Sequence, residues 1–163
     1  MSKGKLFAIT LKDSSLVLTR LVEATKIEDE LDKLSFKDDI VDVTEIKDED
    51  IQCESKIFRN SWKLKNGKVV EDLAKAKEIH MERIRHKRNK KLEGLDLDFM
   101  LALEAGNGPK LDSLREEKQK LRDLPQKFKL TKAKCCKTLC DTWPEDLEKH
   151  EDYEYYKNHP LKV

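Results

Sequence analysis

The feature that most constrains this fold is a long helical repeat of apolar residues that stops abruptly and then starts again. Leu73, Ile84 and Leu95 are spaced by close to three turns of an α-helix. Other apolar residues extend the same side of this helix, namely Met81, Leu92, Phe99, Ala102 and Leu103. The pattern therefore predicts one amphipathic helix of about 30 residues.

The repeat stops at Ala105-Gly106-Asn107-Gly108-Pro109, a sequence typical of a helix end followed by a new start. A second helix carries Leu111, Leu114, Leu121 and Leu124 on one side, and we expect Pro125 to end it. Because the connection is short, the two helices should pack antiparallel as a hairpin. A shorter helix is expected over residues 130–140, and Pro144 should open a fourth that runs to about Lys157.

The first part of the chain favours strands instead of long helices. Residues 5–20 read as two β-rich runs joined by a turn, and residues 26–34 suit a short amphipathic helix. Strands are expected over residues 40–46 and 57–64. Asn66-Gly67 is the strongest hairpin signal in the chain, since both residues tolerate positive φ.

These patterns predict an α+β protein with three regions. A small, mainly antiparallel sheet region spans residues 1–70, the helical hairpin spans 71–125, and short helices with a tail span 126–163. Charged residues make up 41% of the chain and hydrophobic residues 37%, which suits thin helical layers better than a thick core. A long two-helix arm leaves apolar surface uncovered in a monomer, so we expect a homo-oligomer.

The charge balance limits the classes of partner. With 34 basic and 33 acidic residues, the net charge of +1 gives no overall attraction to nucleic acid or to an anionic membrane. We also expect no secretory signal in MSKGKLFAITL and no membrane-spanning segment, because no run approaches the ~20 apolar residues required.

The run Arg83 to Lys91 is the sharpest basic feature. It suggests phosphate contacts by a nucleic-acid-binding regulator. In a helix, however, these charges spread around most of the circumference, and no aromatic residue is interleaved to stack on bases. We therefore favour a solvated helix face, with nucleic-acid binding as the alternative.

Cys135, Cys136 and Cys140, with His150 nearby, suggest a metal site or a packed helix face. Zinc ligands usually come as two separated pairs, a spacing that is missing here. Cys136 and Cys140 share one helix face, where cysteine acts as a small hydrophobe. We therefore expect core packing, reduced thiols, no metal and no cofactor.

Nothing in the sequence predicts a catalytic residue. His80 and His86 lack a convincing acidic or thiol partner at helical spacing, and Glu82 with His86 suits a surface pair. Ser61 has no general base near it in the sequence. Nucleophile elbows, phosphate loops and HExxH motifs are missing, so we expect no enzyme.

A series of short motifs runs from Phe58 to Leu147. The segments are FRNSW (58–62), KAKEIH (75–80), RIR (83–85), LDLDFM (95–100), ALEAG (102–106), KQKLRD (118–123) and WPEDL (143–147). In order and spacing the series resembles a family of small proteins encoded among the tail genes of bacteriophages and prophages. Its members show FRNAW, KAREIHRDRIR, LDVxYMRALEAGD, KQALRD and WPxxL. Three features depart from it: Cys135 and Cys136 replace small residues, Gly94 stands near the place of a usual small residue, and 148–163 add an acidic, tyrosine-containing tail.

The resemblance implies a tail-fibre assembly or tail accessory protein that binds a phage tail or tail-fibre protein. The implied location is the cytoplasm of the bacterial host or the virion, and a host-directed phage effector is a further alternative.

Six residues are candidates for partner binding: Arg85, Asp96, Arg122, Asp123, Trp62 and Trp143. For the charged ones, we favour an ion pair between Asp96 and Arg122 that sets the hairpin register over a polar recognition spot. For the two tryptophans, we favour anchoring to the core over an exposed binding surface.

Overall fold

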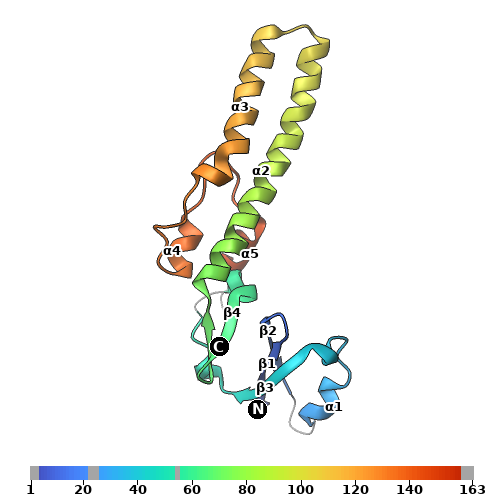
Figure 1. Cartoon of the computed structure of the whole chain (residues 1–163), viewed down its shortest axis with the longest axis vertical. Helices are drawn as coiled ribbons and strands as arrows, with labels where there is room; N and C mark the ends of the chain where they lie inside the picture. The colour runs from blue at the N-terminus through green and yellow to red at the C-terminus, as the bar shows by residue number, and fades with distance from the viewer. Residues whose placement is uncertain (1–3, 22–25, 54–55, 159–163) are drawn as a thin grey trace. The chain divides into compact units, whose positions relative to one another are not determined.

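The computed structural model describes residues 4–21, 26–53 and 56–158. The chain is an α+β protein, as the sequence predicted, with small antiparallel sheets first and helices after them (Figure 1). It divides into two compact units, one that extends to Ala76 and one from Lys77 to Asn158. The last five residues of the predicted tail lie outside the described residues.

The first unit is built on a three-stranded antiparallel sheet. Its central strand β1 (Leu6–Leu11) pairs with β2 (Leu16–Arg20) on one side and β3 (Ile40–Ile46) on the other. In register, Ala8 lies opposite Leu18 in β2 and Thr44 in β3. The strands expected over residues 5–20 and 40–46 are thus confirmed. Short helical segments follow β2 and flank β3, namely α1 (Ile27–Leu31), η1 (Lys37–Asp39) and η2 (Asp48–Asp50).

A two-stranded hairpin completes the first unit. Strands β4 (Trp62–Lys65) and β5 (Lys68–Glu71) are joined by Asn66 and Gly67, with φ values of 52° and 75°. Both positive values are those that an Asn-Gly hairpin turn requires, so this prediction is confirmed. Val69 of β5 and Trp62 of β4 are buried in an apolar core whose other buried members are Leu6, Ala8, Ile46 and Cys53.

The strand expected over residues 57–64 is wrong in its first half. Residues Lys56–Ser61 form the 3-10 segment η3, and the strand begins only at Trp62. Within η3, the Ser61 hydroxyl donates to the Phe58 carbonyl at 2.7 Å. Ile57 and Phe58 are both buried, whereas a strand with alternating faces would turn one of them outward, and the backbone kinks at Phe58 with φ −111° and ψ 32°.

The helical hairpin is present with its predicted turn. Helix α2 (Leu73–Glu104) begins after Asp72, whose carboxylate accepts from the amide of Ala74 at 3.0 Å. Gly106 follows α2 with a φ of 62°, a conformation that favours glycine. Asn107 caps α3 (Gly108–Lys127) by accepting from the Lys110 amide at 3.1 Å. Figure 1 shows the two helices side by side and antiparallel.

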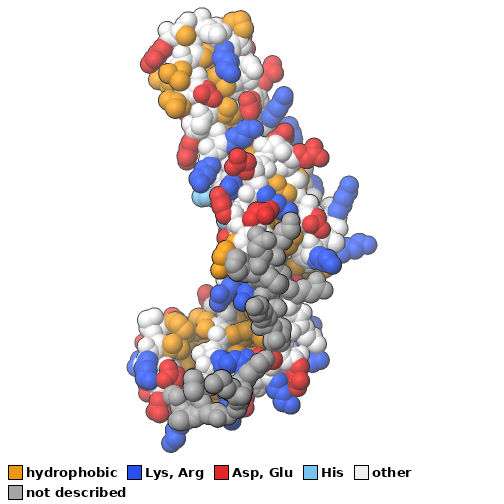
Figure 2. All heavy atoms as spheres, turned by 180° about the vertical axis from the view of Figure 1, so that it is seen from behind, with side chains coloured by type: hydrophobic (Ala, Val, Ile, Leu, Met, Phe, Trp, Pro, Cys, Tyr) orange, Lys and Arg blue, Asp and Glu red, His pale blue; other side chains and the backbone are white. Residues whose placement is uncertain are grey.

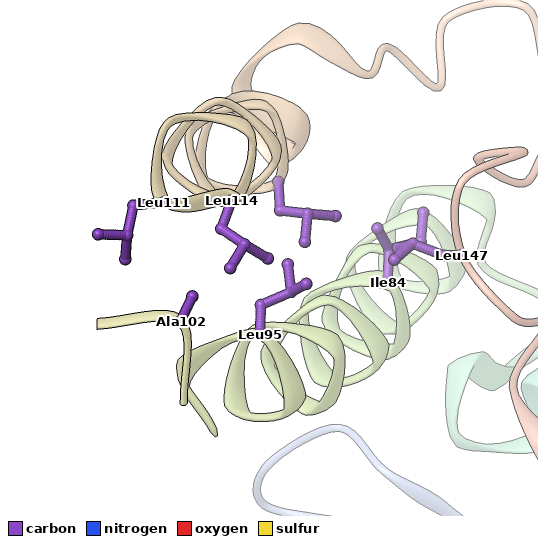
Figure 3. Close-up of a cluster of buried hydrophobic side chains, with 7 residues drawn as sticks. Ile84, Leu95, Ala102, Leu111, Leu114 and Leu147 are labelled. Atoms are coloured by element: carbon purple, nitrogen blue, oxygen red, sulfur yellow. The ribbon is translucent and has the colours of Figure 1, made fainter. Parts of the chain in front are cut away.

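A layer of leucines seals the inner face of the hairpin. Leu95 and Ala102 of α2 point toward Leu111 and Leu114 of α3 (Figure 3). Leu121 extends this seam, and Ile84 lies against Leu147 nearer the start of α2. Leu103 was expected on this face but is 53% exposed. At about 100° per residue it lies some 80° from Leu95, which turns it out of the seam.

The predicted ends of the later helices need correction. Helix α3 continues through Pro125 to Lys127 and does not end at the proline. The third helix is only α4 (Cys136–Asp141), and the fourth, α5 (Glu151–Asn158), does not open at Pro144. Among the helices of the described chain, none is both long enough and apolar enough to cross a membrane.

Candidate functional site

A buried polar cluster joins α5 to α2 in the second unit. His80 of α2 is fully buried, and its Nδ1 lies at hydrogen-bond distance from the Tyr153 hydroxyl of α5. Its Nε2 lies 2.7 Å from the carbonyl oxygen of Thr142. A carbonyl oxygen can only accept, so Nε2 carries the proton and Nδ1 accepts from Tyr153. The Trp143 ring packs edge-on against the imidazole, with centroids 5.4 Å apart.

Burial keeps this cluster uncharged. Loss of hydration lowers the pKa of His80 to about 4 and raises the pKa of Tyr153 to about 12. At neutral pH both side chains are therefore neutral, and both imidazole nitrogens are engaged inside the protein. The cluster holds α5 and the end of α4 against α2, and its imidazole does not reach an external substrate.

The two tryptophans are anchored in the two cores. Trp62 is 7% exposed within the first unit. Trp143 is partly buried against the hairpin core, and its indole N–H donates to the Leu147 carbonyl at 3.0 Å. The structure thus places both where anchoring was expected and exposes little of either ring to a partner.

The predicted pair of Asp96 with Arg122 is wrong. Asp96 instead pairs with Lys118, one turn earlier in α3, because the hairpin register brings that residue opposite. Asp123 accepts from Lys127 and Gln119, both at 2.8 Å, and these hydrogen bonds lower the pKa of its carboxyl group. The structure therefore does not bring the four charged candidates together, and it leaves Arg85 and Arg122 exposed on separate helices.

Acidic residues already engage half of the basic run. Arg83 pairs with Asp152 at 2.8 Å, Lys87 with Glu151 at 2.6 Å, and Lys91 with Glu117 at 3.2 Å. The hydrogen bond from Lys87 lowers the pKa of Glu151 to about 2. These ion pairs link α5 and α3 to α2, so half of the basic residues in this run hold helices of the second unit together.

The cysteines near α4 take different environments. Cys136 is buried, as the core-packing interpretation predicted, whereas Cys140 is half-buried and Cys135 is exposed. None of the three forms a disulfide. Within residues 4–21, 26–53 and 56–158, no group of three or more His, Cys, Asp or Glu side chains gathers closely enough to hold a metal ion.

The end of the hairpin presents an uncovered apolar surface. Leu97, Met100 and Leu101 on one face of α2 are 64%, 53% and 55% exposed, and Leu103, to one side of that face, is 53% exposed. Figure 2 shows apolar side chains gathered over this end of the hairpin. Exposed apolar side chains that adjoin one another, unlike scattered ones, mark a contact surface.

The sequence contains the residues of this surface, but a single apolar repeat for α2 does not distinguish them from the residues that face α3. At about 100° per residue, Leu97 lies on the far side of α2 from the seam residues Leu95 and Ala102, and Leu101 lies about 100° or more from both. α2 is therefore apolar on two opposite faces near its end, and α3 covers only one of them. Treating all apolar residues of the helix as one stripe hides the second face.

No protein-family model, curated protein or solved structure matches this chain. The resemblance to phage tail proteins therefore stays a prediction that rests on the motifs themselves. What the structure adds is a sealed hairpin, a buried neutral cluster and an open apolar face.

Proposed function

We propose that the protein is a non-enzymatic accessory protein of a phage or prophage tail that acts through contacts with other proteins, with tail-fibre assembly as its task. The ordered motifs from Phe58 to Leu147 support the tail assignment. The observation that carries the mode of action is the exposed apolar surface of Leu97, Met100 and Leu101. Side chains of this kind gain free energy when a protein partner removes them from water.

The two units suit two kinds of contact. The hairpin supplies a stiff arm whose inner face is sealed and whose outer face is open. In the first unit, β3 is an edge strand among the described residues, and Val41 on it is 64% exposed. An edge strand can take an added strand from a partner, with main-chain hydrogen bonds for affinity and side chains for selectivity. We propose that β3 meets the tail or fibre protein, in the cytoplasm of the bacterial host.

Nucleic-acid binding has weaker support. Arg83, Lys87 and Lys91 are already in ion pairs, and Arg85, Arg88 and Lys90 remain on different sides of α2. If the chain did bind nucleic acid through this run, its affinity would fall steeply with added salt. It would also be lost when Arg85, Lys87 and Arg88 are neutralised together.

Co-expression with the products of neighbouring tail genes tests the proposal. Affinity capture followed by native mass measurement should recover the chain with a tail or fibre component. Val41→Lys, which places a charge on the β3 edge, should reduce capture, whereas Val41→Thr keeps a β-branched side chain and should not. Recovery of the chain without any tail component would overturn the proposal. Equal capture by the Val41→Lys and Val41→Thr variants would overturn the role proposed for β3.

A further inference from the structure

We propose that the open face of α2 docks on the same face of a second copy of this chain, with the two α2 helices antiparallel and centred on Leu97. This deepens the proposed function, on which it rests only for the premise that the hairpin acts through protein contacts. The face is defined by Leu97, Met100 and Leu101, which are 64%, 53% and 55% exposed. Charge, shape and size each bear on its occupant.

Polar residues complete this face along the helix axis. Taking Leu97 as its centre and about 100° per residue, residues on both sides along the helix lie within some 60° of it, namely Lys90, Glu93, Gly94, Met100, Leu101 and Glu104. The face therefore has Lys90 at one end and Glu104 at the other, with Glu93, Gly94 and the apolar residues Leu97, Met100 and Leu101 between them. Because the two ends of the face carry opposite charges, parallel and antiparallel alignments of two identical helices bring different charges together.

The charges favour the antiparallel alignment. Lys90 and Glu104 are equally far from Leu97 in the sequence, so each Lys90 lies opposite Glu104 of the other copy. Neither residue has an ion-pair partner among the described residues, and both side chains are exposed. A parallel alignment would instead set Glu93 against Glu93 and Glu104 against Glu104. Opposite charges at contact attract and like charges repel, so self-docking on this face is specified in orientation.

Shape supports the same alignment. Gly94 is exposed, and no atom lies within 4 Å of the point where a Cβ would stand. Gly94 is three residues before Leu97, and Leu101 is four residues after it. In the antiparallel pair, Gly94 therefore lies at nearly the same level as Leu101 of the other copy, on the same flank of the two-fold axis. The backbone there offers a notch for a leucine side chain, and the two Leu97 side chains meet at the axis.

The size of the face sets the expected strength. A standard interface uses about 20–30 residues from each partner, and this one is much smaller. We therefore expect a reversible dimer that forms with rising concentration, with a dissociation constant in the micromolar range or weaker.

Sedimentation equilibrium of the purified full chain, without any tail protein, tests this. Between about 5 and about 500 µM the mean mass should rise from monomer toward dimer. Leu97→Glu should weaken dimerisation at least about tenfold. The matched control Leu103→Glu replaces a leucine of similar exposure that lies off this face, and it should dimerise as the wild type does.

A charge exchange tests the orientation. Lys90→Glu and Glu104→Lys should each weaken the dimer, and the two together should restore it, because opposite charges then face one another again. A monomeric wild type, equal effects of the Leu97 and Leu103 variants, or no restoration by the double variant would overturn the inference. Any of these outcomes would leave capture of a tail component by co-expression unaffected, so the two proposals fail separately. Unchanged circular dichroism would confirm that each variant folds, as expected for exposed positions.

Discussion

His80 shows how burial determines the chemistry of a single side chain. Its neighbours in sequence give no hint of a partner, yet Tyr153 and Thr142 engage both ring nitrogens. Tyr153 lies 73 residues away, so only the tertiary fold brings the two together. The imidazole therefore acts as a neutral fastening between α2 and α5, and it must stay neutral for that purpose.

We expect acid to destabilise the helical unit between pH 6.5 and pH 4. His80 has a pKa of about 4 in the folded protein and an ordinary value of 6.5. In that window the unfolded chain binds more protons, so stability falls as the pH falls through it. The full effect is about 3 kcal/mol. Burial also lowers the pKa of His150, which adds a contribution of the same sign.

Thermal unfolding followed by circular dichroism across this pH range measures the effect. His80→Gln should remove most of the pH dependence, whereas His86→Gln, at an exposed position, should retain it. A pH profile of His80→Gln that matched the wild type would mean that His80 does not carry the effect.

The helices of the hairpin bury apolar side chains on one face and leave apolar side chains exposed on another. Leu114 is 3% exposed in the seam, and Leu97 on the opposite side of α2 is 64% exposed. Burial of apolar area, rather than helix propensity, therefore supplies most of the stability of this pair of helices.

Truncating the seam should cost far more than truncating the open face. For Leu114→Ala we expect a loss of about 2–5 kcal/mol in the free energy of unfolding, since a cavity replaces a buried side chain. For Leu97→Ala we expect a change within about 0.5 kcal/mol in dilute solution. Urea unfolding of both variants provides the comparison, and similar losses would contradict the assignment of the two faces.

The turn of the hairpin depends on a side-chain cap. Asn107 accepts from the Lys110 amide at the start of α3, so Asn107→Ala should destabilise the helical unit by about 1 kcal/mol. Asn107→Asp retains an accepting oxygen and should lose much less. The two melting temperatures decide the point: if they fall equally, the cap does not contribute.

Local patterns explain which elements could be predicted from sequence. Apolar spacing and the Asn-Gly and Gly-Asn-Gly signals located the hairpins, because these features act within a few residues. Pro144 misled the prediction, since the Trp143 indole bonds to the Leu147 carbonyl and Leu147 is drawn into the hairpin core. The His80 cluster and the Asp96–Lys118 pair depend on contacts between distant segments. The open face could have been predicted from the sequence by separating the apolar residues of α2 into two faces.

For the whole molecule, the distribution of charge matters more than its sum. The net charge is +1, and acidic residues of α3 and α5 pair with half of the Lys and Arg residues in the basic run of α2. Within the described part of the second unit, no other element covers the open apolar face of α2, which Lys90 and Glu104 flank. We therefore assign contact with protein to this face.

Photo-crosslinking from this face tests that assignment most directly. With p-benzoylphenylalanine in place of Leu97 in the full chain, illumination should give a covalent dimer joined through α2, which mass spectrometry of the digested product would locate. The same group in place of Leu103 should give little dimer. If position 97 yields no protein adduct at concentrations where the wild type self-associates, or if position 103 yields as much, the open face is not the contact surface.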